Sequence, residues 1–190
     1  MSRRYTLGKR AEQQAETRRR IVEAAIDLHT EVGPARTTIS MVAERAGVQR
    51  HTFYAHFPDD RSLLMACSGL AMERDPFPAA EAWNDIGDRR ARLTAGLEAI
   101  YAYYERNAQL TASVLRDAET SPLVGEIMGQ RMGPLFAETI AVLGDGMTEP
   151  QRALLQVAIS YFTWRTLSRD GGLTRAAAVE TMAAALVAAN

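Results

Sequence analysis

One short stretch of this chain carries side chains that suit the edges of nucleic acid bases. It runs from Gln49 to Tyr54, reads QRHTFY, and offers an amide, a guanidinium, an imidazole and hydroxyl groups. Arg50 suits the O6 and N7 acceptors of guanine, and Gln49 suits adenine or a phosphate. Thr52 fits a thymine methyl group or a phosphate oxygen, and His51 fits a base or a phosphate. We interpret this stretch as a base-reading segment; the alternative is a set of solvated surface residues.

The residues before this segment predict the elements that position it. Thr38 is a typical N-cap, and the following apolar residues recur at the spacing of one buried helical face: Ile39, Val42, Ala43 and Ala46. Gly47 permits a tight reversal, and Val48 can fill the gap between two helices. Phe53 and Phe57 remain to anchor the second helix in the core. Two short helices joined in this way predict a helix-turn-helix whose second helix enters the DNA major groove.

Charge is distributed as DNA binding requires, although the net charge of the chain is only −1. Residues 1–57 contain 10 Lys or Arg and 6 Asp or Glu, whereas residues 58–190 contain 12 and 17. A positive first third favours phosphate contacts that release counterions; chance variation in surface charge is the alternative. Candidate phosphate contacts, which fix register without reading sequence, are Arg36, Thr37, Thr38 and Arg61.

The rest of the chain predicts an all-α protein of about nine helices. Outside the motif, helices are expected at about 17–31, 60–74, 89–104, 107–119, 122–143, 148–168 and 174–190. Gly133-Pro134 should kink the helix over 122–143, and Thr148 and Gln151 fit a capping box. We expect a flexible basic arm over 1–16, with Arg3, Arg4, Lys9 and Arg10. A helix-turn-helix domain over 17–58 and a helical domain over 59–190 should follow.

The motif residues resemble those of the TetR family of transcriptional repressors. The matching residues are Thr37-Thr38, Val42-Ala43, Ala46-Gly47-Val48 and Tyr54-Ala55-His56-Phe57, preceded by a first helix over 20–28. The resemblance implies a homodimer that binds DNA, with a ligand-binding and dimerisation domain after the motif. It also implies that Tyr54 donates its hydroxyl to a phosphate. The chain departs from the family pattern at Gln49, His51 and Asp60, so contacts at these positions do not carry over.

The expected helix over 148–168 is apolar on two sides, and a helix of that kind is covered on both. One side would face the core and the other a twofold partner, as the resemblance also implies; a purely intramolecular core is the alternative. Candidate dimer-interface residues are Leu154, Val157, Ala158, Tyr161, Met182 and Leu186.

Most aromatic and methionine residues lie in the second part of the chain, where such side chains can line an apolar cavity. Arg116 could pair with an anionic group of a ligand. Candidate pocket residues are Tyr101, Tyr104, Arg116, Met128, Met132, Phe136 and Phe162. The alternative is a plain helical core.

The sequence offers little for other functions. It shows no nucleophile motif, phosphate loop or pair of catalytic carboxylates, and its three histidines lack metal-ligand spacing. We therefore expect no enzyme activity, no cofactor and no metal. The single Cys67 fits an inert buried thiol in a reducing cytoplasm, and no signal peptide or membrane span is expected.

These expectations combine into one hypothesis. The chain is predicted to be a cytoplasmic repressor that binds a pseudo-palindromic operator as a homodimer and is released by a small-molecule effector. The alternatives are a transcriptional activator or a ligand-independent DNA-binding protein. A small helical enzyme or binding protein is a more remote possibility.

Overall fold

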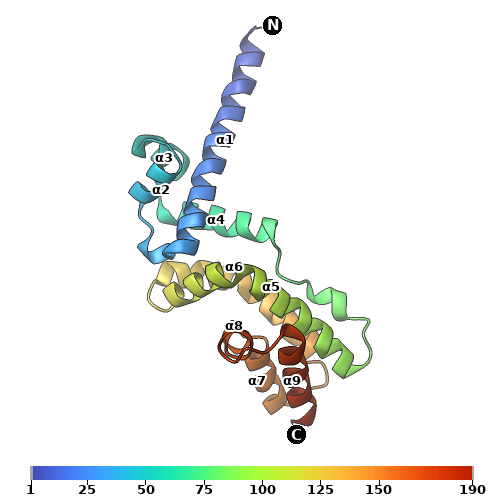
Figure 1. Cartoon of the computed structure of the whole chain (residues 1–190). Coiled ribbons are helices and arrows are strands. Elements are labelled where there is room, and N and C mark those ends of the chain that lie inside the picture. The colour runs from blue at the N-terminus through green and yellow to red at the C-terminus, as the bar shows by residue number, and fades with distance from the viewer. Residues whose placement is uncertain (1, 190) are drawn as a thin grey trace. The chain divides into compact units, whose positions relative to one another are not determined.

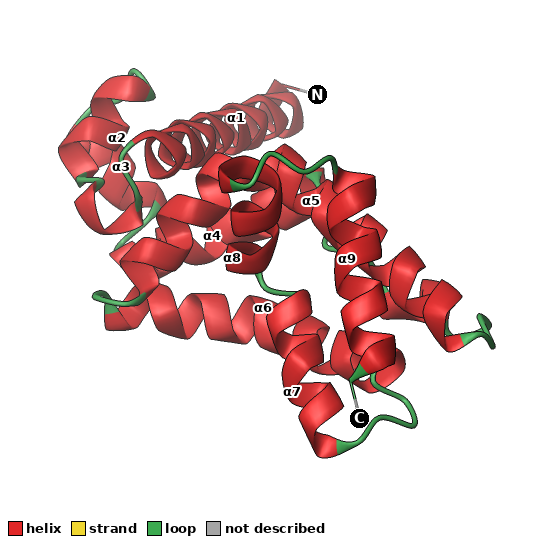
Figure 2. Ribbon diagram, turned by 60° about the horizontal axis from the view of Figure 1, so that its bottom comes forward, coloured by secondary structure: helices red, strands yellow, loops and turns green. Residues whose placement is uncertain are grey.

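The fold consists of helices, most of them joined by short turns. A computed structural model describes the backbone of residues 2–189 and the side chains of residues 8–189, and this part of the chain contains no strand (Figure 2). Its α-helices are α1 (Ser2–Glu31), α2 (Ile39–Arg45), α3 (Arg50–His56), α4 (Asp60–Arg74), α5 (Arg89–Ala118), α6 (Pro122–Leu143), α7 (Glu149–Ala158), α8 (Tyr161–Trp164) and α9 (Arg175–Ala188) (Figure 1). The predicted all-α class is confirmed.

Three helical pieces that are not α-helical lie between these helices. Two are 3-10 turns, over Pro34–Arg36 and Ala80–Trp83, and one is a π-helical turn over Arg165–Asp170. No helix in the described part of the chain is long and apolar enough to cross a membrane.

The chain forms two compact units. We call residues 1–74 and 112–128 the head unit, and residues 75–111 and 129–190 the body unit. The head unit therefore contains α1 to α4 together with the end of α5 and the start of α6, which we call the corner (residues 112–128). The sequence prediction ended the first domain at residue 58, because no local signal shows that a later segment packs against an earlier one.

The core of the head unit is built from the helices that carry the predicted motif. The buried side chains come from α1 (Ile21, Val22, Ala24, Ala25, Leu28), α2 (Val42, with Ala46 at its end), α3 (Phe53, with Phe57 at its end) and α4 (Leu63, Cys67). Phe53 and Phe57 are fully buried, as the spacing predicted. The burial of two phenyl rings, each contributing on the order of 2 kcal/mol, ties the short helix α3 to the unit.

The first helix is longer than the sequence predicted. Residues 2–16, expected to be a flexible arm, continue α1 toward the N-terminus. This stretch lacks proline, and Arg19 pairs with Glu16 and Glu23 at helical spacing, an arrangement that supports an exposed helix. The side chains of Arg3 and Arg4 lie outside the described residues.

Two predicted boundaries fall differently in the structure. The helices expected over 89–104 and 107–119 form one element, α5, with a kink at Asn107 (φ −110°, ψ 16°). Conversely, the helix expected over 148–168 is interrupted after Ala158. There Ser160 starts α8, its Oγ accepting a hydrogen bond from the amide of Phe162 at 3.2 Å. The predicted number of about nine helices agrees with the structure only because two expected helices are merged and another expected helix is divided.

Tertiary hydrogen bonds satisfy the interrupted backbone at the end of α7. The hydroxyl of Tyr101 donates to the carbonyl of Ala158, and the hydroxyl of Tyr104 donates to the carbonyl of Ile159, each at 2.8 Å. Both tyrosines lie on α5, three residues apart, and both are buried. An unpaired buried carbonyl costs about 1–3 kcal/mol, so the two phenols stabilise the break.

The predicted capping box is present: Thr148 and Gln151 form it at the start of α7. The Thr174 side chain accepts a hydrogen bond from the amide of Ala177 and caps α9, where the sequence predicted a helix start. Pro134 lies inside α6, where its missing amide removes one helical hydrogen bond.

Candidate nucleic-acid interface

The turn between α2 and α3 has the geometry that the sequence predicted. Gly47 adopts φ +64°, a left-handed conformation that glycine accepts without strain. The amide of Val48 donates to the carbonyl of Ala43 at 2.9 Å, and that of Gly47 donates to Glu44 at 3.1 Å. This pair of bonds is a Schellman motif, which ends α2 and fixes the direction in which the chain enters α3.

One face of α3 is anchored and the other is free. Phe53 and Phe57 lie in the core with ring centroids 5.9 Å apart, and the Arg18 guanidinium lies 4.6 Å from the centre of the Phe57 ring. Tyr54, on the outer side, is 45% exposed. The helix is only seven residues long, so its direction depends on these contacts rather than on its own hydrogen bonds.

The predicted base-reading residues lie together on the outer side of α3. Gln49, Arg50 and His51 are exposed, and Thr52 is half-buried. Gln49 is the N-cap but makes no capping hydrogen bond through its side chain. Among residues 8–189, no hydrogen bond or ion pair engages the side chains of these four residues. Their polar groups are therefore available to a partner.

The predicted phosphate contacts are placed by local hydrogen bonds before α2. The Arg36 Nε donates to the carbonyl of Val32 at 2.9 Å, and the Thr37 hydroxyl donates to that of Gly33 at 2.8 Å. The Thr38 Oγ accepts from the amide of Met41 at 3.3 Å, which confirms it as the N-cap of α2. A guanidinium has five N–H groups, so Arg36 still has donors available for a phosphate. The Thr38 hydroxyl accepts a hydrogen bond through its oxygen and can still donate its proton to a phosphate.

Arg61, the fourth predicted phosphate contact, is engaged by the corner. Its two terminal nitrogens meet the two carboxylate oxygens of Glu126 at 2.9 and 2.5 Å. Hydrogen bonding to Glu126 raises the pKa of the Arg61 guanidinium above its usual value. Both side chains are about half exposed, so a competing anion can reach them.

The corner also holds the connection between α1 and α2. Asp117, which is buried, accepts a hydrogen bond from the amide of Ala35 at 2.9 Å. Neither Asp117 nor Glu126 is among the site residues that the sequence predicts. They lie 82 and 65 residues from their partners, and no spacing rule reaches across such a separation.

The predicted ligand-pocket residues are divided between the two units. Arg116 and Met128 belong to the head unit, whereas the other five belong to the body unit. Arg116 has structural partners, Asp117 and the carbonyl of Val32. Tyr101 and Tyr104 use their hydroxyls at the end of α7, and Phe162 is 50% exposed.

Three of the candidates, Tyr104, Phe136 and Phe162, belong to an aromatic cluster in the body unit. Among the described residues, seven rings lie with neighbouring centroids 5.1–6.0 Å apart: Phe77, Tyr103, Tyr104, Phe136, Tyr161, Phe162 and Trp164. Met132 lies on α6, one turn before Phe136. Burial raises the pKa of Tyr101 and Tyr104, which keeps both phenols protonated and able to donate.

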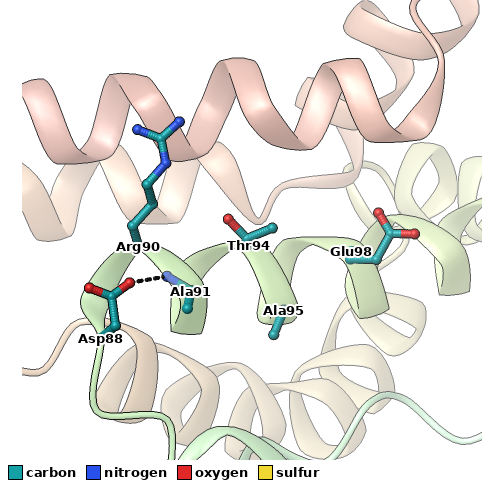
Figure 3. Close-up of a pocket in the computed structure, with 6 residues that line it drawn as sticks. All are labelled: Asp88, Arg90, Ala91, Thr94, Ala95 and Glu98. Atoms are coloured by element: carbon teal, nitrogen blue, oxygen red, sulfur yellow. Dashed lines mark hydrogen bonds between the residues drawn. The ribbon is translucent and has the colours of Figure 1, made fainter.

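A shallow hollow elsewhere in the body unit contains none of the predicted pocket residues. It follows the first turns of α5 and is lined by Asp88, Arg90, Ala91, Thr94, Ala95 and Glu98 (Figure 3). The Asp88 carboxylate accepts a hydrogen bond from the amide of Ala91 at 2.7 Å (Figure 3). Arg90 pairs with Glu180 of α9. Charged groups that already have partners make this hollow a poor match for the predicted apolar pocket.

The predicted dimer-interface residues divide into two groups. Ala158, Tyr161 and Leu186 are buried within the protomer at 0, 6 and 1% exposure, and Met182 is at 9%. Leu154 is half-buried, and Val157 is 52% exposed. A helical face that already packs inside the protomer cannot also cover a second copy. The apolar side chains that these segments leave exposed are instead Val157, Phe162, Leu173 and Val187.

Two further features bear on chemistry. No group of three or more His, Cys, Asp or Glu side chains in the described residues could hold a metal ion. Burial raises the pKa of the Cys67 thiol to about 12, so the sulfur is held in its unreactive protonated form.

Comparison with known sequences identifies the motif region. The sequence model of the family described as "Bacterial regulatory proteins, tetR family" matches residues 21–67. An uncharacterised HTH-type transcriptional regulator of Mycobacterium tuberculosis is 39% identical over 141 residues, which cover 73% of this chain and 69% of that protein. The HTH-type transcriptional repressor KstR of Mycolicibacterium smegmatis is 29% identical over 136 residues, covering 69% of this chain and 66% of that protein.

Solved structures share the fold across nearly the whole chain. GusR of Salmonella enterica superposes with a TM-score of 0.64 at 18% identity, over 90% of this chain and 94% of its own. The regulator FadR of Bacillus subtilis, in complex with stearoyl-CoA, gives 0.59 at 18% identity, over 89% and 97%. With the helix-turn-helix geometry and the sequence matches, these results show that the chain belongs to the TetR family of DNA-binding transcriptional regulators.

Proposed function

We propose that the protein is a repressor that binds a pseudo-palindromic operator as a homodimer. The observation that carries this proposal is the outer side of α3, where Gln49, Arg50, His51 and Thr52 have no side-chain partner in residues 8–189. Polar groups on a rigidly anchored helix are already placed for base edges in the major groove. The similarity to KstR, which is named as a repressor, favours repression over activation.

The symmetry and the half-site spacing of the operator follow from the pairing of two copies of the protein. Two recognition helices related by a twofold axis read half-sites about 34–36 Å apart, or a multiple of that distance, on one face of the DNA. We assign the pairing surface to the outward sides of α7 to α9, where Val157, Phe162 and Val187 are about half exposed. Regulators of this family bind DNA as dimers. Light scattering at micromolar concentration should give twice the monomer mass of 20.9 kDa; a monomer would overturn this assignment.

We place the effector site beside the aromatic cluster of the body unit. Trp164 is 1% exposed and its Nε1–H has no hydrogen-bond partner within the described residues, and the hydroxyl of Thr139, at 0% exposure, also lacks one there. A buried polar group without a hydrogen-bond partner destabilises the protein. A ligand that supplies an acceptor would remove this penalty and gain binding free energy. Trp164 also leads directly into the π-helical turn Arg165–Asp170, and such turns are frequent at functional sites.

The DNA-binding proposal is tested by selecting bound sequences from a random duplex library. Enrichment of an inverted repeat with the predicted spacing is the expected result, and its affinity should fall steeply as salt is raised. Recovery of no sequence above background, or binding that does not depend on salt, would overturn the proposal.

The effector proposal needs a separate measurement. The variant Trp83→Phe leaves Trp164 as the only tryptophan, so its fluorescence reports the aromatic cluster alone. Small molecules that raise the melting temperature should change this fluorescence and weaken operator binding together. If stabilising compounds leave the Trp164 emission unchanged, the site lies elsewhere; if they leave operator affinity unchanged, they are not effectors.

A further inference from the structure

We propose that Asp117 is a positioning residue for DNA binding: it holds the connection between α1 and α2, and through it the phosphate-binding residues 36–38. This inference rests on the proposed DNA-binding function. Asp117 belongs to the last turn of α5 and is 5% exposed. A buried carboxylate cannot touch DNA, and its charge would repel phosphates, so any contribution to binding must act through other residues.

The carboxylate joins two donors from different parts of the chain. Its Oδ2 accepts from the amide of Ala35 at 2.9 Å, and its Oδ1 accepts from the Nε of Arg116 at 2.8 Å. The Nη2 of Arg116 in turn donates to the carbonyl of Val32 at 3.1 Å. The end of α5 therefore binds the connection on both sides of Gly33.

Arg116 and a predicted phosphate contact share one acceptor. The carbonyl of Val32 accepts from Arg116 and also from the Nε of Arg36 at 2.9 Å. Ser113, one turn earlier on α5, donates to the carbonyl of Thr30 at 3.3 Å. The last carbonyls of a helix lack intrahelical partners, and here α5 supplies partners at the end of α1, just before the DNA-binding segment.

Close packing at Gly33 shows that the connection fits against α5 without spare room. Gly33 adopts φ +98°, and a Cβ built on it would overlap the Nη2 of Arg116 and the Oδ2 of Asp117. Glycine is thus required both for the backbone conformation and for the approach of these two side chains. Asp117 therefore meets the connection through close packing at Gly33 as well as through its hydrogen bond to Ala35.

The charge of Asp117 is maintained by its neighbours. Burial alone would raise its pKa, but hydrogen bonds from Arg116 and from the amide of Ala35, and the charges of Arg116 and Arg36, hold it below the usual value. The carboxylate is therefore ionised at neutral pH and attracts Arg36. Loss of that charge should loosen Arg36, Thr37 and Thr38 together, because they follow the connection directly.

The variant Asp117→Asn separates positioning from simple electrostatics. An amide can accept one of the two hydrogen bonds but turns its NH₂ group toward the other donor. Removing a negative charge near DNA should by itself strengthen binding. Positioning predicts the opposite: operator affinity about tenfold weaker, with the slope of log affinity against log salt reduced by about 1 for each phosphate that the loosened segment no longer neutralises.

A matched variant controls for the charge change. Asp145→Asn removes the same charge from a side chain of the body unit that is 80% exposed, and should leave affinity and salt slope unchanged. Amide hydrogen exchange should show faster exchange at Ala35 in Asp117→Asn but not in Asp145→Asn.

The outcomes are distinguishable. If the wild-type protein binds no selected DNA, the proposed function fails before any variant is considered. If the wild type binds and a folded Asp117→Asn binds as tightly or more tightly with an unchanged slope, the positioning role is overturned. If Asp117→Asn does not fold by circular dichroism, Arg116→Gln decides, because it removes the hydrogen bond to Val32 at a side chain that is 49% exposed. Unchanged affinity in that variant would also overturn the role.

Discussion

The guanidinium of Arg61, at the start of α4, is held by both carboxylate oxygens of Glu126, at the start of α6. Arg61 is a predicted phosphate contact. The Glu126 carboxylate therefore binds the same guanidinium that a DNA phosphate would bind. An exposed pair of this kind is worth little in stability, and a phosphate can therefore displace the carboxylate.

Glu126→Gln should strengthen DNA binding, because it releases Arg61 for a phosphate. We expect roughly threefold tighter binding to operator and to random duplex alike, with a salt slope steeper by about 0.9. Glu31→Gln provides a matched control, since Glu31 forms the same two-bond pair with Arg45, at 2.9 Å for each bond. The gain should also disappear in the background of Arg61→Ala; a gain that persists there would contradict the competition.

Arg50→Ala should weaken operator binding by about 1–3 kcal/mol and relax selectivity at one base pair, as expected for the loss of a base-reading guanidinium. Binding titrations against a panel of single-base operator variants provide the measurement. Arg89→Ala, which removes a half-buried arginine of the body unit that donates to the carbonyl of Gly146, is the control of equal charge. Uniform weakening across the whole panel would show instead that Arg50 contacts a phosphate.

The head unit should lose stability in mild acid because of His29. This side chain is 5% exposed, and burial lowers its pKa from 6.5 to about 4, although the nearby charge of Asp117 acts in the opposite direction. Between these values the unfolded chain binds a proton that the folded chain does not. The free energy of unfolding should therefore fall as the pH falls from about 6.5 to 4, by up to about 3 kcal/mol.

Urea titrations across this pH range test the effect, with His29→Phe as the variant that should flatten the dependence. His51→Gln is the control, since it removes an exposed imidazole of the same unit. An equal slope in the wild type and in His29→Phe would contradict the role of His29.

Tyr101→Phe and Tyr104→Phe should each lower the free energy of unfolding by about 1–3 kcal/mol, because each leaves a buried carbonyl at the end of α7 without its donor. Tyr103→Phe is the matched control: within residues 8–189 its hydroxyl has no hydrogen bond, and it lies on the same helix. Chemical denaturation measures all three. Equal losses at the three positions would point to ring packing rather than to the hydrogen bonds.

Much of the fold and of the reading surface could be predicted from local patterns. Gly47 and Val48 dictate the turn between α2 and α3 because its hydrogen bonds close within six residues. Thr38, Thr148 and Thr174 mark helix starts for the same reason. Burial of Phe53 and Phe57 follows from their spacing, which leaves the polar residues of α3 facing outward.

Features that depend on distant partners could not be predicted in this way. The division after Ala158 needs donors from α5, and the burial of Ala158, Tyr161 and Leu186 within one protomer depends on how the helices of the body unit pack. A doubly apolar helix fits a core on both sides or a core and a partner equally well, so the pattern alone could not separate these cases.

The same distinction applies to the DNA-binding site. The groups that we propose to face DNA are specified by residues within one short segment, because a helix places its side chains by periodicity alone. How firmly that segment is held, and whether Arg61 is free, depends on Asp117 and Glu126, which meet it only after the chain has folded back. These hydrogen bonds join atoms that lie far apart along the chain and meet only in the folded protein. No spacing pattern in the sequence therefore predicts them.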